Sequence, residues 1–319
     1  PLAGLFDSIF LDLDGVVYRG GSAVPGAVAA IATIPVGSFG FLTNNANRTP
    51  QSIAEHLGAL GIVTDADSVV TSAQAIAGLI AVDLPARSPG FVVGGDGLRT
   101  AIGEVGLKPV SDREAASAVV QGYSPEISWR DLAEVSYAVQ SGIPWYVSNL
   151  DLTIPTAAGI APGNGSLVQA VSTATGTNPV VAGKPFAPLY EAAKARFASV
   201  APLMIGDRLD TDIRGANLAS MDSLLVLTGV NTLADVLSAD PIDRPTFVSA
   251  DLSGLQHLHP EVRVEAGTSS CGTAVAQVRA NTLHLTQPGE DSTQSLRALT
   301  ALGWQFVDET TEAVQLDAR

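Results

Sequence analysis

The sequence predicts an α/β fold, with a Rossmann-like core on a parallel sheet, a second α/β domain inserted into that core, and a small α+β tail domain. Three observations lead to this prediction. Apolar β-type runs alternate with helix-type segments from the start of the chain, the alternation recurs over residues 185–229, and a separate series of strands and helices lies between these two blocks. Such alternation is typical of βαβ units on a mainly parallel sheet.

The predicted core begins with a strand at 8–15, "SIFLDLDG", and a helix at 23–34. A second strand and a second helix are expected at 37–45 and 49–61. The late block supplies two helices and two buried strands, expected at 185–199, 210–221, 201–207 and 222–229. These blocks are expected to form one domain, at residues 1–77 and 183–252.

The inserted domain is expected at residues 78–182, where strands and helices alternate on their own. The pattern of apolar and polar residues changes again at residue 253. Short antiparallel strands are expected there, followed by an amphipathic helix with Leu296, Leu299 and Leu302 near helical spacing. Residues 253–319 are therefore expected to form the small α+β tail domain.

Composition and charge exclude several classes of protein. The chain has 319 residues, of which 46% are hydrophobic, and this is enough for two domains and a smaller third one. Acidic residues number 32 against 17 basic ones, a net charge of -15 without a basic run, which argues against a nucleic-acid partner. An anionic substrate would be repelled by this overall charge, so it would need a local cation.

Membrane insertion is not expected, because no window of about 18 consecutive residues is apolar. The opening "PLAGLFDSIF" lacks the pattern of a signal peptide, so a cytoplasmic location is expected. Cys271 is the single cysteine, which excludes an internal disulfide and indicates a free thiol. The sequence leaves open whether two copies form a homodimer.

Two carboxylates, Asp12 and Asp14, stand where the first predicted strand ends. Residues two apart in extended backbone point the same way, so both side chains are expected to face one site. A hard cation such as Mg²⁺ would offset their repulsion, or one carboxyl would stay protonated as a general acid. The alternative is that Asp14 and Gly15 only form a turn.

Two further sets of polar residues precede helices, and ligands of open α/β sheets bind where strands end. Thr43 and Asn44 follow the second strand, where their side chains and nearby backbone N–H groups can donate to an oxyanion. The alternative is that they only cap the next helix. Lys184 precedes Pro185 in "GKP" and can supply the local cation, unless it is a solvated surface residue.

A third set follows the buried strand expected at 201–207. Asp207, Asp210 and Asp212 fall within six positions. Carboxylate ligands at a strand end suit Mg²⁺, which usually takes few protein carboxylates and keeps waters. The alternative is an acidic turn that caps the following helix.

The four motifs "DLDG", "TNN", "GKP" and "GDRLDTD" stand in the order of the motifs of the haloacid dehalogenase (HAD) superfamily, which the sequence resembles over roughly residues 5–250. The long gap between Asn45 and Lys184 resembles the C2-type cap of its type IIA branch, which includes NagD-like and p-nitrophenyl-phosphatase-like proteins. This resemblance implies a phosphatase with a cap that closes over the site and selects the substrate.

The resemblance also implies a role for each matched residue. Asp12 would be the nucleophile that becomes an aspartyl phosphate, and Asp14 would protonate the leaving alkoxide and then deprotonate water. Lys184 would neutralise developing charge and orient Asp12. Phosphate or substrate would be contacted by Thr43, Asn44, Asn45, Asn149 and Asp151. Mg²⁺ would be held by Asp12, the backbone carbonyl of Asp14 and Asp207, with Asp212 as a further ligand or a partner through water and Asp210 outside.

The implied function is Mg²⁺-dependent hydrolysis of a small phosphorylated metabolite. Glycerol 3-phosphate is the first choice, because the layout resembles actinobacterial glycerol 3-phosphate phosphatases, whose tail is a truncated acetyltransferase-like (GNAT) module. The glycine-rich loop for acetyl-CoA is not recognisable between Gly267 and Gly303, so a packing or regulatory tail is expected. Alternatives are 2-phosphoglycolate, pyridoxal 5′-phosphate or a nucleoside monophosphate as substrate, or a non-catalytic regulatory protein.

Several other features are expected to be structural. His56 is expected at a surface or boundary, and the tail histidines His257, His259 and His284 lack the further ligands of a metal site. The glycine run at 94–97 matches no nucleotide-binding pattern and is expected to be a tight turn. Residues 163–165 match positions that approach the site in the HAD branch, although turn chemistry explains them almost as well.

Overall fold

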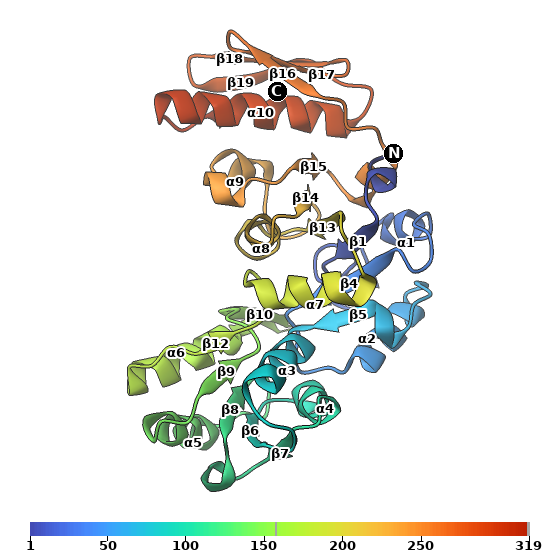
Figure 1. Cartoon of the computed structure of the whole chain (residues 1–319). Coiled ribbons are helices and arrows are strands. Elements are labelled where there is room, and N and C mark those ends of the chain that lie inside the picture. Colours follow the sequence, from blue (N-terminus) through green and yellow to red (C-terminus); the bar gives the residue numbers. More distant parts are fainter. Residues whose placement is uncertain (157, 318–319) are drawn as a thin grey trace. The chain divides into compact units, whose positions relative to one another are not determined.

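The chain folds into two compact units, one made of residues 1–39 and 197–319 and the other of residues 40–196. The structure is a computed structural model that describes residues 1–156 and 158–317. Figure 1 labels the helices and strands along the chain. No helix in the described ranges is long and apolar enough to cross a membrane.

A parallel sheet is the centre of the first unit. Its strands are β1 (Ser8–Leu11), β13 (Pro202–Gly206), β14 (Asp222–Val226) and β15 (Phe247–Ser249), in the order β15-β14-β13-β1. Neighbouring strands are parallel, with Ile9 opposite Leu203 and Leu203 opposite Asp222. Every residue of β1 and β13 is buried, as expected for strands of a parallel sheet.

Short helices and one hairpin connect the strands of this unit. The helices are α1 (Ala27–Ile31), α8 (Arg214–Leu218) and α9 (Leu233–Leu237), and the hairpin pairs β2 (Tyr18–Arg19) with β3 (Ser22–Ala23). A π-helical turn at Leu209–Ile213 leads into α8. Its apolar residues Leu209 and Ile213 pack with Val236 and Val248, so the segment after β13 is anchored to the core.

The end of the first unit is a mostly antiparallel sheet with one long helix. The strands run in the order β16 (Val262–Glu265), β17 (Thr268–Cys271), β18 (Ala274–Arg279), β19 (Thr282–Gln287) and β20 (Gln315–Leu316). Only β20 runs parallel to its neighbour. Helix α10 (Ser292–Thr310) lies along one face of this sheet (Figure 1) and buries Ala298, Leu299 and Leu302 there.

The second unit contains two groups of strands. β4 (Phe39–Thr43) pairs in parallel with β5 (Val69–Thr71). A separate all-parallel sheet has the order β12 (Val180–Val181), β9 (Trp145–Val147), β8 (Ala118–Gln121), β6 (Pro89–Val93) and β7 (Lys108–Val110). An antiparallel hairpin, β10 (Thr153–Thr156) with β11 (Gly159–Pro162), precedes the last helix of this series.

The helices of the second unit follow the strands with clear start signals. They are α2 (Pro50–Ala59), α3 (Ser72–Asp83), α4 (Asp96–Glu104), α5 (Trp129–Gln140), α6 (Asn164–Thr175) and α7 (Ala187–Phe197). Capping boxes at Thr71 and Ser128 begin α3 and α5. Apolar residues of α5 and α6, Val135 and Val171 among them, pack on β8 and β9 to form a core.

The predicted α/β fold class is confirmed. The predicted tail helix is present and continues to Thr310, six residues beyond the predicted end at 304. The hairpin of β10 and β11 was not predicted, and α1 is shorter than the predicted helix at 23–34. The predicted domain limits at 77, 182 and 252 stay a prediction.

Candidate active site

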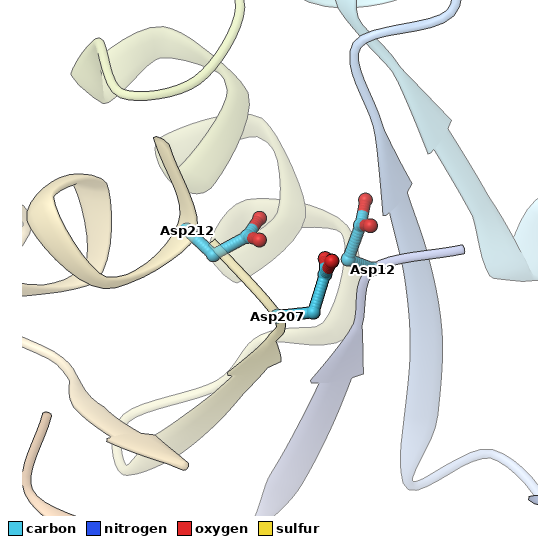
Figure 2. A group of neighbouring side chains, drawn as sticks. All are labelled: Asp12, Asp207 and Asp212. Carbon is cyan, nitrogen blue, oxygen red and sulfur yellow. The ribbon is translucent and has the colours of Figure 1, made fainter. Parts of the chain in front are cut away.

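Three carboxylates come together in the first unit. Asp12, Asp207 and Asp212 each offer one oxygen, and these oxygens lie within 4.8 Å of one another. Figure 2 shows Asp12 and Asp207 beside each other at the ends of two strands, with the carboxylate of Asp212 directed toward them. Three acidic side chains grouped so closely suit a hard divalent cation with oxygen ligands.

The local fold explains why these residues meet. Asp12 and Asp207 directly follow β1 and β13, which are parallel neighbours, so both emerge at the same edge of the sheet. The backbone N–H of Asp12 donates to the carbonyl of Ile205 at 2.8 Å. Asp212 lies in the π-helical turn, and its Oδ2 accepts from the backbone N–H of Arg208 at 3.2 Å. The carboxylates are therefore set by the sheet and by the turn that follows it.

Glycines make room for two of the carboxylates. A Cβ at Gly206 would overlap the side chain of Asp212, and a Cβ at Gly229 would overlap that of Asp207. A Cβ at Gly15 would also meet Asp207, with its Cγ at 2.7 Å, and Gly15 has a φ of +88° that favours glycine. The carboxylates are thus enclosed by backbone, and Asp207 and Asp212 are each only 1% exposed. Such enclosure fits a cation-binding pocket whose ligands are fixed in advance.

Asp207 also supports the fold. Its Oδ2 accepts from the backbone N–H of Val230 at 2.7 Å, and its backbone carbonyl accepts from Asn231 at 3.2 Å. Asn231 in turn accepts from the N–H of Leu209 at 2.9 Å. Part of the alternative reading of this stretch as a structural acidic turn is therefore correct, although α8 has no side-chain cap.

Asp14 lies apart from this group. β1 ends at Leu11, and beyond it Leu13 is 1% exposed while Asp14 is exposed. Asp14 and Gly15 also begin a turn, in which the N–H of Gly15 donates to the carbonyl of Tyr18 at 2.8 Å. Thr228 binds the Gly15 carbonyl at 2.7 Å and ties this turn to the loop after β14. An exposed carboxyl can exchange a proton with water, as a general acid and base must.

Asp210 is engaged elsewhere. Its carboxylate accepts from the Arg208 guanidinium at 2.8 and 3.1 Å. Partial burial raises the pKa of Asp210, but these hydrogen bonds and the Arg208 charge outweigh it, and the pKa lies below its usual value. Asp210 does not belong to the group formed by Asp12, Asp207 and Asp212. The sequence also predicted a place for Asp210 outside the metal ligands.

The second unit holds the other predicted site residues, beginning at the end of β4. Thr43 is 4% exposed, and its Oγ1 accepts from the N–H of Asn45 at 3.1 Å. Asn45 is exposed, and its Oδ1 accepts from the N–H groups of Asn47 and Arg48 at 2.9 and 3.2 Å. The N-cap of α2 is Thr49, so the alternative that Thr43 and its neighbour cap this helix is wrong.

Asn44 joins three segments of this unit. Its Nδ2 donates to Asp151 Oδ1 at 3.1 Å and to the carbonyl of Lys184 at 3.2 Å. Its Oδ1 accepts from the N–H of Lys184 at 2.7 Å, and its own carbonyl accepts from Asn149 Nδ2 at 2.6 Å. The predicted residues Asn44, Asn149, Asp151 and Lys184 are therefore connected, although they are distant in sequence.

Lys184 is buried, at 3% exposed, so the alternative of a solvated surface lysine is wrong. Its Nζ donates to the carbonyl of Leu42 at 3.1 Å, which places the ammonium group at the end of β4. A buried ammonium group is suited to attracting an anion, so Lys184 fits the local cation that the sequence predicts.

The remaining predicted features are structural. Gly163 is the N-cap of α6 and Gly165 lies in its first turn, and both closely approach the carbonyls of Asp151 and Leu150. The run at 94–97 leads into α4 rather than forming a separate turn, since the helix begins at Asp96. Within the part of the chain that the structure describes, no histidine joins a group of metal-ligating side chains.

The tail histidines and the cysteine have local partners. His259 bonds to the Gly254 carbonyl at 2.8 Å, and His284 to Asp317 at 2.6 Å. Burial lowers the pKa of His259, while the Gly254 hydrogen bond opposes this. Cys271 is a buried free thiol, as predicted, and burial raises its pKa.

Sequence reasoning missed the residues that hold the site residues in place. Ser72 donates to the Asn44 carbonyl at 2.7 Å. Asn164, which lies in the stretch 163–165 already noted in the sequence, donates to the Asn149 carbonyl at 2.8 Å. Gly206 and Gly229 were also missed. A signal existed for Gly206, because it directly precedes Asp207 at the end of a buried strand.

Three carboxylates meet at the ends of parallel strands in this α/β chain, which also buries a lysine. These features are typical of a class of metal-dependent hydrolytic enzymes. Family comparison is consistent with that class: a model of haloacid dehalogenase-like hydrolases matches residues 9–108, and a HAD-hydrolase-like model matches residues 181–255. The chain belongs to the haloacid dehalogenase-like hydrolase family. The predicted membership is thereby confirmed.

Similar proteins include phosphatases. The chain is 45% identical over 250 residues to a D-glycerol 3-phosphate phosphatase of Mycobacterium tuberculosis, covering 78% of this chain and 70% of the relative. It is 33% identical to an acid sugar phosphatase of Staphylococcus saprophyticus, covering 78% of this chain and 96% of the relative. A crystal structure of a glycerol phosphate phosphatase from Mycobacterium tuberculosis in complex with magnesium has a TM-score of 0.86 and 36% identity, covering 100% of this chain and 95% of that one.

Proposed function

We propose that this chain is a Mg²⁺-dependent phosphomonoester hydrolase and that glycerol 3-phosphate is its substrate. The observation that carries the proposal is the group of Asp12, Asp207 and Asp212, whose oxygens lie within 4.8 Å of one another. The substrate is supported by the relative named for D-glycerol 3-phosphate at 45% identity, and the metal by the magnesium complex of a similar phosphatase.

Mg²⁺, held by Asp12, Asp207 and Asp212 together with the backbone carbonyl of Asp14, would neutralise phosphoryl charge when bound. In the first half-reaction, an oxygen of Asp12 attacks phosphorus and the bond to the glycerol oxygen breaks. Asp14 gives its proton to that leaving alkoxide. The products are free glycerol and an aspartyl phosphate on Asp12.

The second half-reaction returns the enzyme to its starting state. Asp14, now a carboxylate, takes a proton from water as the water oxygen attacks phosphorus. The bond between phosphorus and Asp12 breaks, and inorganic phosphate leaves. The Lys184 ammonium, with the Thr43 hydroxyl and backbone N–H groups after β4, would bind phosphoryl oxygens in both steps. A buried lysine supplies the local attraction that an anionic substrate needs on a chain of net charge -15.

A second candidate is the same chemistry on another small phosphate. The acid sugar phosphatase relative at 33% identity favours a sugar phosphate among these. The remaining candidates are 2-phosphoglycolate, pyridoxal 5′-phosphate and nucleoside monophosphates, which the same groups would attack in the same way.

Comparison of kcat/KM across these phosphomonoesters tests the choice of substrate. We expect glycerol 3-phosphate to exceed each of the others by about tenfold or more, as for a site that recognises the leaving group. A preference of similar size for a different phosphate would reject glycerol 3-phosphate as the substrate but would leave the proposed phosphatase reaction intact. The absence of turnover of any of them by folded protein with Mg²⁺ would reject the chemistry as well.

A further inference from the structure

We propose that Asn44 is a positioning residue, whose carboxamide, oriented by Asp151, fixes the backbone of Lys184 and does not bind the phosphoryl group itself. The inference rests on the proposed phosphatase function, and it revises the expectation that the Asn44 side chain contacts phosphate. It also assigns Asp151 a role, which is to orient the Asn44 carboxamide.

The carboxamide has no hydrogen left for a substrate. Its Nδ2 carries two hydrogens, and it donates them to Asp151 Oδ1 at 3.1 Å and to the Lys184 carbonyl at 3.2 Å. Its Oδ1 accepts from the Lys184 N–H at 2.7 Å. What remains is an acceptor lone pair, which a phosphoryl oxygen would avoid because that oxygen is an acceptor too.

The orientation of this carboxamide follows from the chemistry of its partners. The backbone N–H of Lys184 can only donate, so the atom facing it must be the oxygen. The carbonyl of Lys184 and an ionised Asp151 can only accept, so the atom facing them must be the nitrogen. A flipped amide would lose all three bonds, and Asp151 therefore helps to hold the orientation that Lys184 requires.

The consequence for Lys184 is a backbone fixed from both sides. Its N–H and its carbonyl bond to the same carboxamide, at 2.7 and 3.2 Å, and its Nζ donates to Leu42 at 3.1 Å. These bonds span about 140 positions of sequence. A catalytic ammonium group must be placed to within a fraction of an ångström to stabilise transition-state charge, and such bonds achieve this.

Asn44 can act this way because its own backbone is held. Its carbonyl accepts from Ser72 Oγ at 2.7 Å and from Asn149 Nδ2 at 2.6 Å. Asn149 is tied in turn to Asp151, whose N–H donates to Asn149 Oδ1 at 3.1 Å. Asn44, Asn149 and Asp151 therefore belong to one largely buried polar network, in which each member depends on the others.

Gly183 gives independent support. A Cβ at this position would lie 2.5 Å from Asn44 Oδ1, 2.5 Å from the Ser148 carbonyl and 2.9 Å from Asn149 Cβ. Real Cβ atoms do not approach oxygen so closely, so a larger residue would push the carboxamide away from Lys184. The glycine of "GKP" thus allows the close approach that the Asn44 and Lys184 pair needs.

A double-mutant cycle tests whether Asn44 acts through Lys184. We expect Asn44→Ala to lower kcat/KM for p-nitrophenyl phosphate about tenfold or more, the size expected when a buried hydrogen-bonding partner is removed. In a Lys184→Ala background the same change should cost less than about threefold, because the group it positions is gone. An undiminished tenfold loss in that background would mean direct phosphate binding by Asn44 and would overturn the proposal.

A charge swap tests the part of Asp151 without relying on turnover. Asn44→Asp places a second carboxylate next to that of Asp151. The repulsion between them should lower the unfolding temperature. Adding Asp151→Asn should restore at least half of that loss, because the new amide at 151 can donate to the new carboxylate. If the unfolding temperature is not restored, Asp151 does not orient the Asn44 carboxamide. This readout stays informative even if the proposed phosphatase activity is absent.

Two further variants keep the test decisive if Asn44→Ala folds poorly. Gly183→Ala should reproduce the loss of kcat/KM without deleting any hydrogen-bonding group, and unchanged kcat/KM would contradict the need for the close approach. Asn217→Ala is the matched control: it also removes an amide that bonds two backbone carbonyls, those of Ile242 and Arg244. Its kcat/KM should stay within about threefold of the wild type.

Discussion

At the scale of single residues, the paired aspartates after β1 have different environments. Leu13 between them is 1% exposed, while Asp14 is exposed and Asp12 is intermediate. Asp12 belongs to the carboxylate group with Asp207 and Asp212. These different environments match the proposed division of roles, in which Asp12 is the nucleophile and Asp14 transfers the proton.

Asp14→Asn tests this division of roles. The amide cannot exchange a proton with the leaving alkoxide or with water, so kcat should fall about a hundredfold or more. Binding of inorganic phosphate in the presence of Mg²⁺, measured by calorimetry, should change by less than about threefold, because the nucleophile and the carboxylate group are intact. A near-normal kcat would assign the proton transfer to another group.

At the scale of elements, the carboxylates depend on one glycine at the end of β13 and another in the loop after β14. Gly206 and Gly229 leave no room for a Cβ beside Asp212 and Asp207. Gly229, unlike Gly15, has no positive φ, so a methyl group there would act by displacing Asp207 and not by straining the backbone.

Gly229→Ala should therefore weaken Mg²⁺ binding about ten- to a hundredfold, as changes beside a metal ligand typically do. The measurement is the Mg²⁺ concentration that half-activates turnover, supported by calorimetric titration of the protein with Mg²⁺. Gly103→Ala, in α4, is the control, because a Cβ there meets nothing within 4 Å. Equal Mg²⁺ affinities for both variants would refute the role of Gly229.

The order of strands and helices, and much of the candidate site, could be predicted from the sequence. Asp12 and Asp207 were predictable because polar residues directly after buried strands are unusual, and strand ends share an edge of a parallel sheet. Lys184 was predicted from its place before a helix in "GKP" and from the family resemblance. The contacts that hold these side chains in place could not be predicted. The carboxamide of Asn44 meets Lys184 across 140 positions, and the space beside Gly229 depends on how two loops approach each other.

At the scale of the whole molecule, the tail helix α10 packs against the parallel-sheet core within the first unit. Trp304 Nε1 donates to the carbonyl of Val236 in α9 at 2.7 Å, and the Arg244 guanidinium lies 5.5 Å from the Trp304 ring centroid. Arg244 also makes two 2.6 Å bonds to Asp308. These contacts support the expectation of a packing tail.

Trp304→Phe tests a packing role for the tail. The ring remains but the N–H donor is lost, so the free energy of unfolding by urea should fall by about 1 kcal/mol. The kcat/KM should be unchanged, since Trp304 has no proposed part in the chemistry. Trp129→Phe is the control, because Trp129 is 79% exposed and its loss should leave stability unaltered. A large fall in kcat/KM for Trp304→Phe would instead indicate a tail that regulates the site.

The most direct test of the account is p-nitrophenyl phosphate turnover, with and without Mg²⁺, by the wild type, Asp12→Asn and Asp210→Asn. Both variants remove one carboxylate charge, but only Asp12 belongs to the carboxylate group. We predict Mg²⁺-dependent turnover that falls about a thousandfold or more in Asp12→Asn and by less than about threefold in Asp210→Asn, with unfolding temperatures close to that of the wild type. Turnover without metal, or substantial turnover by folded Asp12→Asn, would contradict the account.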